Sequence, residues 1–229
     1  MLAEDYKNGQ ILLIDKPLHW TSFQAVNKVR WALRKKFGLK KIKVGHAGTL
    51  DPLATGLLVL CTGKFTKKIQ QLQAETKEYT GTIILGATTP SFDLETAIDR
   101  TYPIDHISEK MILEGAASLT GRIMQIPPMY SAIKKDGVRL YEKARKGEQA
   151  QIKPREVEIT TFEITGIRLP EVHFRITCSK GTYIRSIASD LGKALGSGAY
   201  LSALRRTKSG GFDVSNALSP EEFTSSLED

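Results

Sequence analysis

The stretch that organises this chain is residues 43–63, which read KVGHAGTLDPLATGLLVLCTG. Asp51 is its only acidic residue and stands among small residues. The glycines at positions 45, 48 and 56 permit turns and the close approach of another chain, and Pro52 disfavours a helical conformation at Asp51. We therefore expect a loop to present this carboxylate. The ordinary alternative is that the Asp-Pro pair only begins a turn.

The segment before Asp51 is strongly basic. The chain has 229 residues and a formal net charge of +8. No Asp or Glu occurs between Lys16 and Leu50, whereas eight Lys and Arg residues fall there. A local excess of positive charge suits a partner rich in phosphate, and nucleic acid is such a partner. The alternative is a lysine-rich helix face that is simply solvated.

Hydrophobic periodicity and end signals predict an ordered series of elements. Helices are expected from Thr21 or Ser22 to Gly38, from Ser108 to Thr120, from Thr182 to Gly196, and over a short segment from Ser219. Strands are expected over residues 9–15, 56–61, 77–87, 153–167, 171–178 and 198–207. Because no linker or repeat separates these elements, we expect one continuous domain over residues 1–229.

Residues 125–147 have an unusual composition for a connecting segment. They contain two prolines, two tyrosines and six Lys or Arg residues. Cations can meet phosphates and aromatic rings can meet unstacked bases, so the mixture is typical of a segment that contacts RNA. An ordinary amphipathic helix that follows a turn is the alternative.

The remaining composition narrows the chemistry. The four histidines are scattered, and Cys61 and Cys178 lack metal-ligand spacing, so we expect both cysteines to be small core residues. No signal peptide or apolar run of about 18 residues appears, which favours a cytoplasmic protein without membrane association. Arg185 falls in the first turn of a predicted helix, where a cation opposes the helix dipole, so a nearby anion is expected.

The motif Gly45-His46-Ala-Gly-Thr-Leu-Asp51-Pro-Leu-Ala-Thr-Gly56 resembles the catalytic motif of the TruB-type tRNA pseudouridine synthases. Further segments strengthen the resemblance, which covers roughly residues 9–210: 13–17, 77–79, 128–134, 140–145, 178–185 and 204–206. The resemblance implies an α+β fold in which helices flank a mixed, largely antiparallel central sheet with an RNA-binding cleft.

The same resemblance implies an isomerase that converts uridine 55 in the T arm of tRNA to pseudouridine, with no cofactor or metal. Asp51 would be the nucleophile, and its target is either the anomeric carbon of the ribose or carbon 6 of the uracil. Tyr79 would lie against the target base. Arg185 would pair with Asp51 and keep it ionised.

The resemblance also implies a set of substrate-binding residues. Lys16 and Leu204 would support the floor of the pocket, and His46 would fill the space that the flipped base leaves or contact the RNA there. Residues from about 125 to 150 would form a thumb-like insertion that closes on the T loop. The other residues implied to bind RNA are Tyr130, Lys134, Arg145 and Tyr183.

The sequence departs from the family pattern in two places. Residues 88–96 read TTPSFDLET, in which Asp93 matches the family but Thr89, Pro90 and Thr96 do not. Only about twenty residues follow the Leu204-Arg-Arg segment, so no C-terminal RNA-binding domain of the PUA type is expected. We expect a monomer. The competing hypotheses are a non-catalytic RNA chaperone that uses the same basic cleft, and a related synthase that acts on another RNA.

Overall fold

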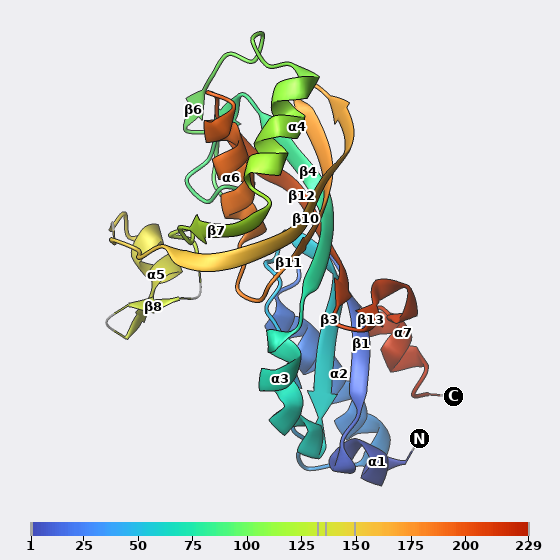
Figure 1. Ribbon diagram of the computed structural model, residues 1–229. Helices are drawn as coiled ribbons and strands as arrows, with labels where there is room; N and C mark the ends of the chain where they lie inside the picture. The colour runs from blue at the N-terminus through green and yellow to red at the C-terminus, as the bar shows by residue number, and fades with distance from the viewer. Residues whose placement is uncertain (1, 132, 136, 149, 229) are drawn as a thin grey trace. The chain divides into compact units, whose positions relative to one another are not determined.

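The computed structural model describes residues 2–131, 133–135, 137–148 and 150–228 (Figure 1). The chain divides into two compact units. Unit 1 comprises Met1–Tyr79 and Leu204–Asp229, and unit 2 comprises Thr80–Ala203. Strands β4 (Lys77–Leu85) and β12 (Ala199–Ser209) contribute residues to both units. The sequence favoured one catalytic domain, and that assignment stays a prediction.

In unit 1 the strands pair around β3 (Ala54–Thr62), whose residues are almost all buried. β3 pairs antiparallel with β1 (Ile11–Lys16) and, through its C-terminal half, with β2 (Val44–His46). It pairs in parallel with β12, where Leu204 lies opposite Ala54. The two-residue strand β13 (Phe212–Asp213) pairs with β12. An all-apolar run such as residues 57–61 is buried on both faces, as its composition predicts.

The longest helix of unit 1, α2 (Ser22–Phe37), has the limits that its end signals predict. The Thr21 side chain accepts a hydrogen bond from the Gln24 amide at 3.1 Å, and Gly38 ends the helix in the left-handed conformation. The other helical elements are α1 (Ala3–Asn8), the 3₁₀ helix η1 (Gly63–Lys68), α3 (Ile69–Ala74), the 3₁₀ helix η2 (Val214–Asn216) and α7 (Pro220–Ser225).

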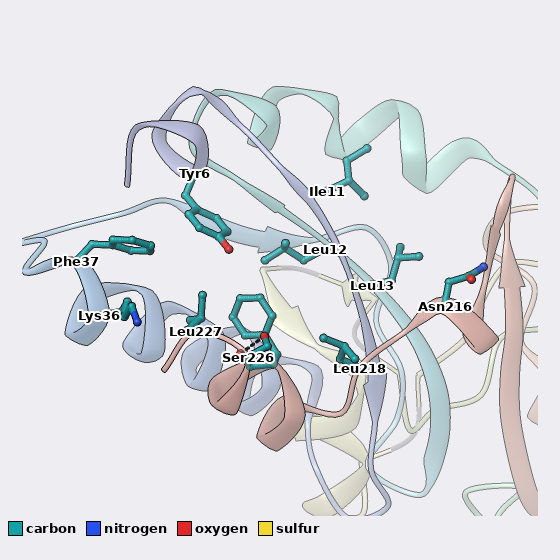
Figure 2. Close-up of a pocket in the computed structure, with 11 residues that line it drawn as sticks. Tyr6, Ile11, Leu12, Leu13, Lys36, Phe37, Asn216, Leu218, Ser226 and Leu227 are labelled. Atoms are coloured by element: carbon teal, nitrogen blue, oxygen red, sulfur yellow. Dashed lines mark hydrogen bonds between the residues drawn. The ribbon is translucent and has the colours of Figure 1, made fainter. Parts of the chain in front are cut away.

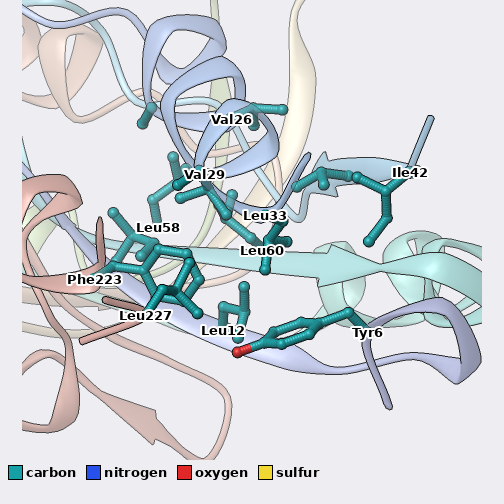
Figure 3. Packing of buried hydrophobic residues seen from close by; sticks show 14 residues of the cluster. Tyr6, Leu12, Val26, Val29, Leu33, Ile42, Leu58, Leu60, Phe223 and Leu227 are labelled. Atoms are coloured by element: carbon teal, nitrogen blue, oxygen red, sulfur yellow. The ribbon is translucent and has the colours of Figure 1, made fainter. Parts of the chain in front are cut away.

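The core of unit 1 lies between α2, the β1–β3 pair and α7 (Figure 3). Val29 and Leu33 of α2 and Leu60 of β3 are fully buried in it. A cavity of about 470 Å³ remains where α1, β1, α2 and α7 meet, and its lining includes Tyr6 and Phe223 (Figure 2). Burial of the apolar side chains of this core is the main stabilising contribution to unit 1.

In unit 2 the strands lie side by side in the order β12, β4, β11 (Glu171–Cys178), β10 (Arg155–Arg168) and β7 (Gly121–Gln125). β10 pairs antiparallel with both β11 and β7. The helices are α4 (Glu109–Ser118) and α6 (Ile184–Ala194). The smaller elements are β5 (Ala87–Thr88), β6 (Arg100–Thr101), β8 (Lys134–Lys135), β9 (Val138–Arg139) and α5 (Leu140–Arg145).

The α+β class and the mixed, mostly antiparallel sheet are confirmed, and so are the four predicted helices and the burial of both cysteines. The segment 125–147 contains a short hairpin, β8–β9, and the six-residue helix α5, so the amphipathic-helix alternative holds only for residues 140–145. The sequence analysis missed α1, β2, α3 and β7, because elements of three to six residues are too short to show a period. In the described part of the chain, the helices lack the combination of length and apolar composition that spanning a bilayer requires.

Candidate active site

Asp51 lies on the loop between β2 and β3, as its sequence context predicts, and is half-buried. Its carbonyl oxygen accepts a hydrogen bond from the Ala54 amide at 3.0 Å, which starts β3 directly after the loop. The Ser22 hydroxyl donates to the Leu50 carbonyl at 3.0 Å and accepts from the Leu50 amide at 2.8 Å. The first turn of α2 therefore fixes the backbone next to the carboxylate.

Lys16, at the end of β1, is buried with 0% exposure. Its ammonium donates to the carbonyl oxygens of Pro17 at 2.9 Å, Trp20 at 2.6 Å and Pro52 at 3.5 Å. Burial lowers the pKa of Lys16 to about 8, against the opposing effect of the Asp51 charge. The burial of Lys16 and its hydrogen bonds suit a residue that supports the backbone of the Asp51 loop.

Arg206 is a second buried cation in unit 1, with 1% exposure. Its Nε donates to the Leu57 carbonyl at 2.7 Å and an Nη donates to the Gly48 carbonyl at 3.1 Å. It thus ties the start of the Asp51 loop to β3. Gly56 has a φ of +98°, and a Cβ there would lie 2.3 Å from the Arg206 carbonyl oxygen. Only glycine permits this approach of the two strands.

The sequence interpretation assigned no role to Arg206, and the strand pattern supplies only part of the signal. Side chains alternate between the faces of a strand, so two consecutive arginines in β12 must point to opposite faces. Arg205 forms a bidentate pair with Asp15, at 2.9 and 2.6 Å, and is partly exposed. Arg206 points to the opposite face, and only the structure shows that this face is buried.

The other predicted residues of unit 1 lie on neighbouring strands. His46 ends β2 and is half-buried, and burial lowers its pKa, against the opposing effect of a backbone contact with Gly48. The neutral imidazole is therefore favoured. Tyr79 is buried on β4. Leu204 is half-buried opposite Ala54, and its carbonyl oxygen accepts a hydrogen bond from the Thr55 hydroxyl at 3.4 Å.

In unit 2, Arg185 is 3% exposed in the first turn of α6. Within unit 2 an anion lies beside it, since the Asp93 Oδ2 is 3.5 Å from the Arg185 Nε. The guanidinium also donates to the carbonyl oxygens of Ser91 at 3.2 Å and Tyr130 at 2.9 Å. Arg185 therefore joins the 88–96 loop to the first part of the insertion.

The atypical residues of the 88–96 loop make its internal hydrogen bonds. The Thr89 hydroxyl donates to the Asp93 carbonyl at 2.6 Å, and the hydroxyls of Ser91 and Thr96 lie 2.8 Å apart. The Asp93 carboxylate accepts from the Glu95 amide at 2.9 Å. These contacts hold Asp93 toward Arg185, so the departures from the family pattern have a structural role here.

Tyr183 precedes α6, and its backbone amide and carbonyl pair with the Gln125 side chain at 2.8 and 3.1 Å. The Arg155 guanidinium lies 4.7 Å from the centre of the Tyr183 ring. In the insertion, Lys134 is exposed on β8. Arg145 is also exposed, and its Nη2 lies 2.9 Å from Glu95 Oε1.

The structure therefore groups the predicted residues by unit. The unit 1 group is Lys16, His46, Asp51, Tyr79 and Leu204, and the unit 2 group is Tyr130, Lys134, Arg145, Tyr183 and Arg185. The predicted pairing of Asp51 with Arg185 and the RNA-binding cleft involve both units, so both stay predictions. Among the described residues, no three His, Cys, Asp or Glu side chains are grouped so that they could hold a metal ion.

The mixed sheet of this chain has counterparts in two solved structures. A chain from the crystal structure of a Cbf5-Nop10-Gar1 complex matches with a TM-score of 0.68 and 30% identity, covering 93% of this chain and 52% of that chain. A chain from a structure of an H/ACA RNP bound to a substrate RNA matches with a TM-score of 0.65 and 28% identity, covering 93% of this chain and 51% of that chain.

Sequence comparison narrows the class. Residues 34–184 match the TruB family pseudouridylate synthase N-terminal domain, and residues 185–228 match the tRNA pseudouridylate synthase B C-terminal domain. The tRNA pseudouridine synthase B of Flavobacterium johnsoniae is 62% identical over 100% of both chains. That of Phocaeicola vulgatus is 53% identical over 96% of this chain and 93% of its own. The chain belongs to the TruB family.

Proposed function

We propose that this chain isomerises uridine 55 in the T arm of tRNA to pseudouridine and that Asp51 is the nucleophile. The observation that carries the proposal is the local setting of Asp51. It is the only acid in residues 43–63, and the buried cations Lys16 and Arg206 hold the loop on which it stands. Full-length relatives named tRNA pseudouridine synthase B support the reaction and the tRNA substrate.

The reaction breaks the bond between the ribose anomeric carbon and uracil nitrogen 1 and forms a bond from the same ribose carbon to uracil carbon 5. Asp51 attacks either the anomeric carbon or carbon 6, and its bond to that carbon has to break again before the product is complete; both routes suit an ionised carboxylate. The proton on carbon 5 has to leave before the product is complete. We assign Tyr79 to the face of the target base and to the removal of this proton.

The target uridine has to flip out of the base stack, because the ribose anomeric carbon and the reacting carbons of the uracil are not accessible there and have to reorient during the reaction. We assign His46 to the space that the base vacates and Leu204 to the pocket floor. Arg185 is proposed to pair with Asp51 and keep it ionised, and Asp93 is proposed to orient Arg185 for that contact. Asp93 and the Ser91 carbonyl already restrict the guanidinium within unit 2.

The insertion is proposed to contact the T loop through exposed cations and aromatic rings. Lys134 and Arg145 supply charge, and Tyr130 supplies ring surface. Tyr183, which precedes α6 and lies outside the insertion, supplies a second ring. In this proposal the protein acts as a cytoplasmic monomer and uses neither a metal nor a cofactor.

The experiment replaces Asp51 by Asn and by Ala and measures tritium release from carbon-5-labelled uridine in a T-arm transcript. Loss of the nucleophile is expected to lower turnover by about 10⁴-fold or more. Asp105→Asn, at an exposed acid of unit 2, is the matched control and should turn over normally. Undiminished release by both Asp51 variants would contradict the proposal.

The relatives favour an enzyme over a non-catalytic RNA chaperone. A complementation test distinguishes the two roles, because Asp51→Asn retains every cellular function only if binding alone matters. Mapping pseudouridine across total RNA after deletion of the gene would identify any further substrate.

A further inference from the structure

A basic cavity of unit 1 plays no part in the proposed reaction. It has a volume of about 410 Å³. We call it the lysine pocket; its lining residues are Lys7, Lys41, Ile42, Lys43, Gly63, Lys64, Thr66 and Lys67. The five lysines come from α1, from the segment before β2 and from η1, and all are exposed. None of the described residues that line it is acidic.

Little within the described chain neutralises this charge. Lys7 lies 3.5 Å from Glu4, and Lys64 donates to the Asn8 side chain at 2.9 Å. The described residues provide no ion pair for the side chains of Lys41, Lys43 and Lys67. Like charges that converge on one cavity repel one another, so an anion that enters it gains from several cations at once.

The lysine pocket and the Asp51 loop lie at opposite ends of β3. The Asp51 carbonyl bonds to Ala54, the first residue of the strand. At the other end, the Gly63 amide donates to the Lys43 carbonyl at 2.9 Å, directly after Thr62. A nine-residue strand separates its ends by roughly 25–30 Å. Figure 1 shows α1 and α3 beside the C-terminal end of β3, in agreement.

We propose that the lysine pocket binds backbone phosphates of the tRNA at a part of the molecule remote from the target uridine. This inference rests on the proposed function, because it assumes that tRNA is the substrate. The pocket presents cations but no aromatic ring, so it offers phosphate contacts without a surface for stacking bases. It adds affinity without sequence preference, and only for an RNA that extends about 25–30 Å beyond the target nucleotide.

The test compares two substrates and three proteins. The proteins are the wild type, K41Q/K43Q/K67Q, and K110Q/R168Q/K193Q, which removes the same charge from exposed positions of unit 2. The substrates are whole tRNA and a minimal T-arm hairpin. Binding is measured as a function of salt concentration, and turnover is measured by tritium release from both substrates.

For whole tRNA, K41Q/K43Q/K67Q is expected to lower affinity by about 10-fold and to reduce the slope of log affinity against log salt by roughly 2–3. With the hairpin, K41Q/K43Q/K67Q should match the wild type in affinity and turnover. The control triple variant should have the same effect on whole tRNA as on the hairpin. Equal weakening on both substrates, or no weakening on either, would overturn the proposal. Failure of the wild type to release tritium from any substrate would instead contradict the proposed function.

Discussion

The two ends of β3 use basic residues in opposite ways. Where the strand begins, Lys16 and Arg206 are buried, and their hydrogen-bonding groups point at backbone carbonyls. Where it ends, the lysines of the lysine pocket are exposed and face open space. A buried cation has lost its hydrating water and needs hydrogen-bond acceptors from the protein, so it fixes the backbone carbonyl groups around it. An exposed cation keeps its charge available to a partner.

The strongest test of this contrast is Arg206→Met, which keeps the bulk but removes every donor. The carbonyls of Leu57 and Gly48 lose their partner, which is expected to cost about 3–5 kcal/mol of unfolding free energy. Because the Asp51 loop loses an anchor, kcat should fall by about 10²-fold or more. Urea unfolding and single-turnover tritium release measure the two effects. Normal kcat in the folded variant would show that Arg206 has no positioning role.

A smaller effect is expected from Gly56→Ala, which probes the close approach of β3 and β12. The new Cβ would meet the Arg206 carbonyl oxygen at 2.3 Å and the backbone would keep a φ of +98°. We expect a loss of about 2–4 kcal/mol in unfolding free energy. Gly121→Ala is the matched control, because its φ of +93° is similar but its Cβ would meet nothing within 4 Å. Equal losses in the two variants would assign the effect to φ alone.

The smallest effect concerns pH. The pKa of Lys16 is about 8 in the folded protein, below the ordinary value of 10.5. Between these values the unfolded chain binds more protons at Lys16 than the folded chain, so stability rises with pH. Relative to Lys16→Met, the wild type should gain up to roughly 3 kcal/mol between pH 8 and pH 10.5.

Urea unfolding of both proteins at several pH values measures this difference, with Lys41→Met as the exposed-lysine control. A wild-type advantage over Lys16→Met that stays constant, or shrinks as pH rises, would contradict a buried ammonium that is held at an energetic cost.

Periodicity and end signals determined much of the fold. Thr21 and Gly38 limit α2, Ser108 caps α4, and the apolar run after Gly56 forms β3. These features are local, because a cap or a run of apolar side chains acts within a few residues. The loop position of Asp51 and the place of Arg185 in a first helical turn were also visible in the sequence.

The site was predictable only in part. Asp51 was selected because it is the one acid in a glycine-rich stretch and because that stretch resembles a family motif, and its catalytic role stays a prediction. Asp93 was noticed only as a family match. That Asp93 faces Arg185 depends on hydrogen bonds from Thr89 within a loop of unusual sequence. Such contacts depend on how the loop folds, which residue types alone do not specify.

The sequence by itself determined which residues carry charge and which segments form the longer strands and helices. Only the tertiary structure decided which charges are buried. Lys16 and Lys43 are both lysines next to strands, yet one donates to three carbonyl oxygens and the other lines an open pocket. The physical reason is that burial depends on strand pairings between residues far apart in the chain, such as Arg206 with Gly56, and not on the residue itself.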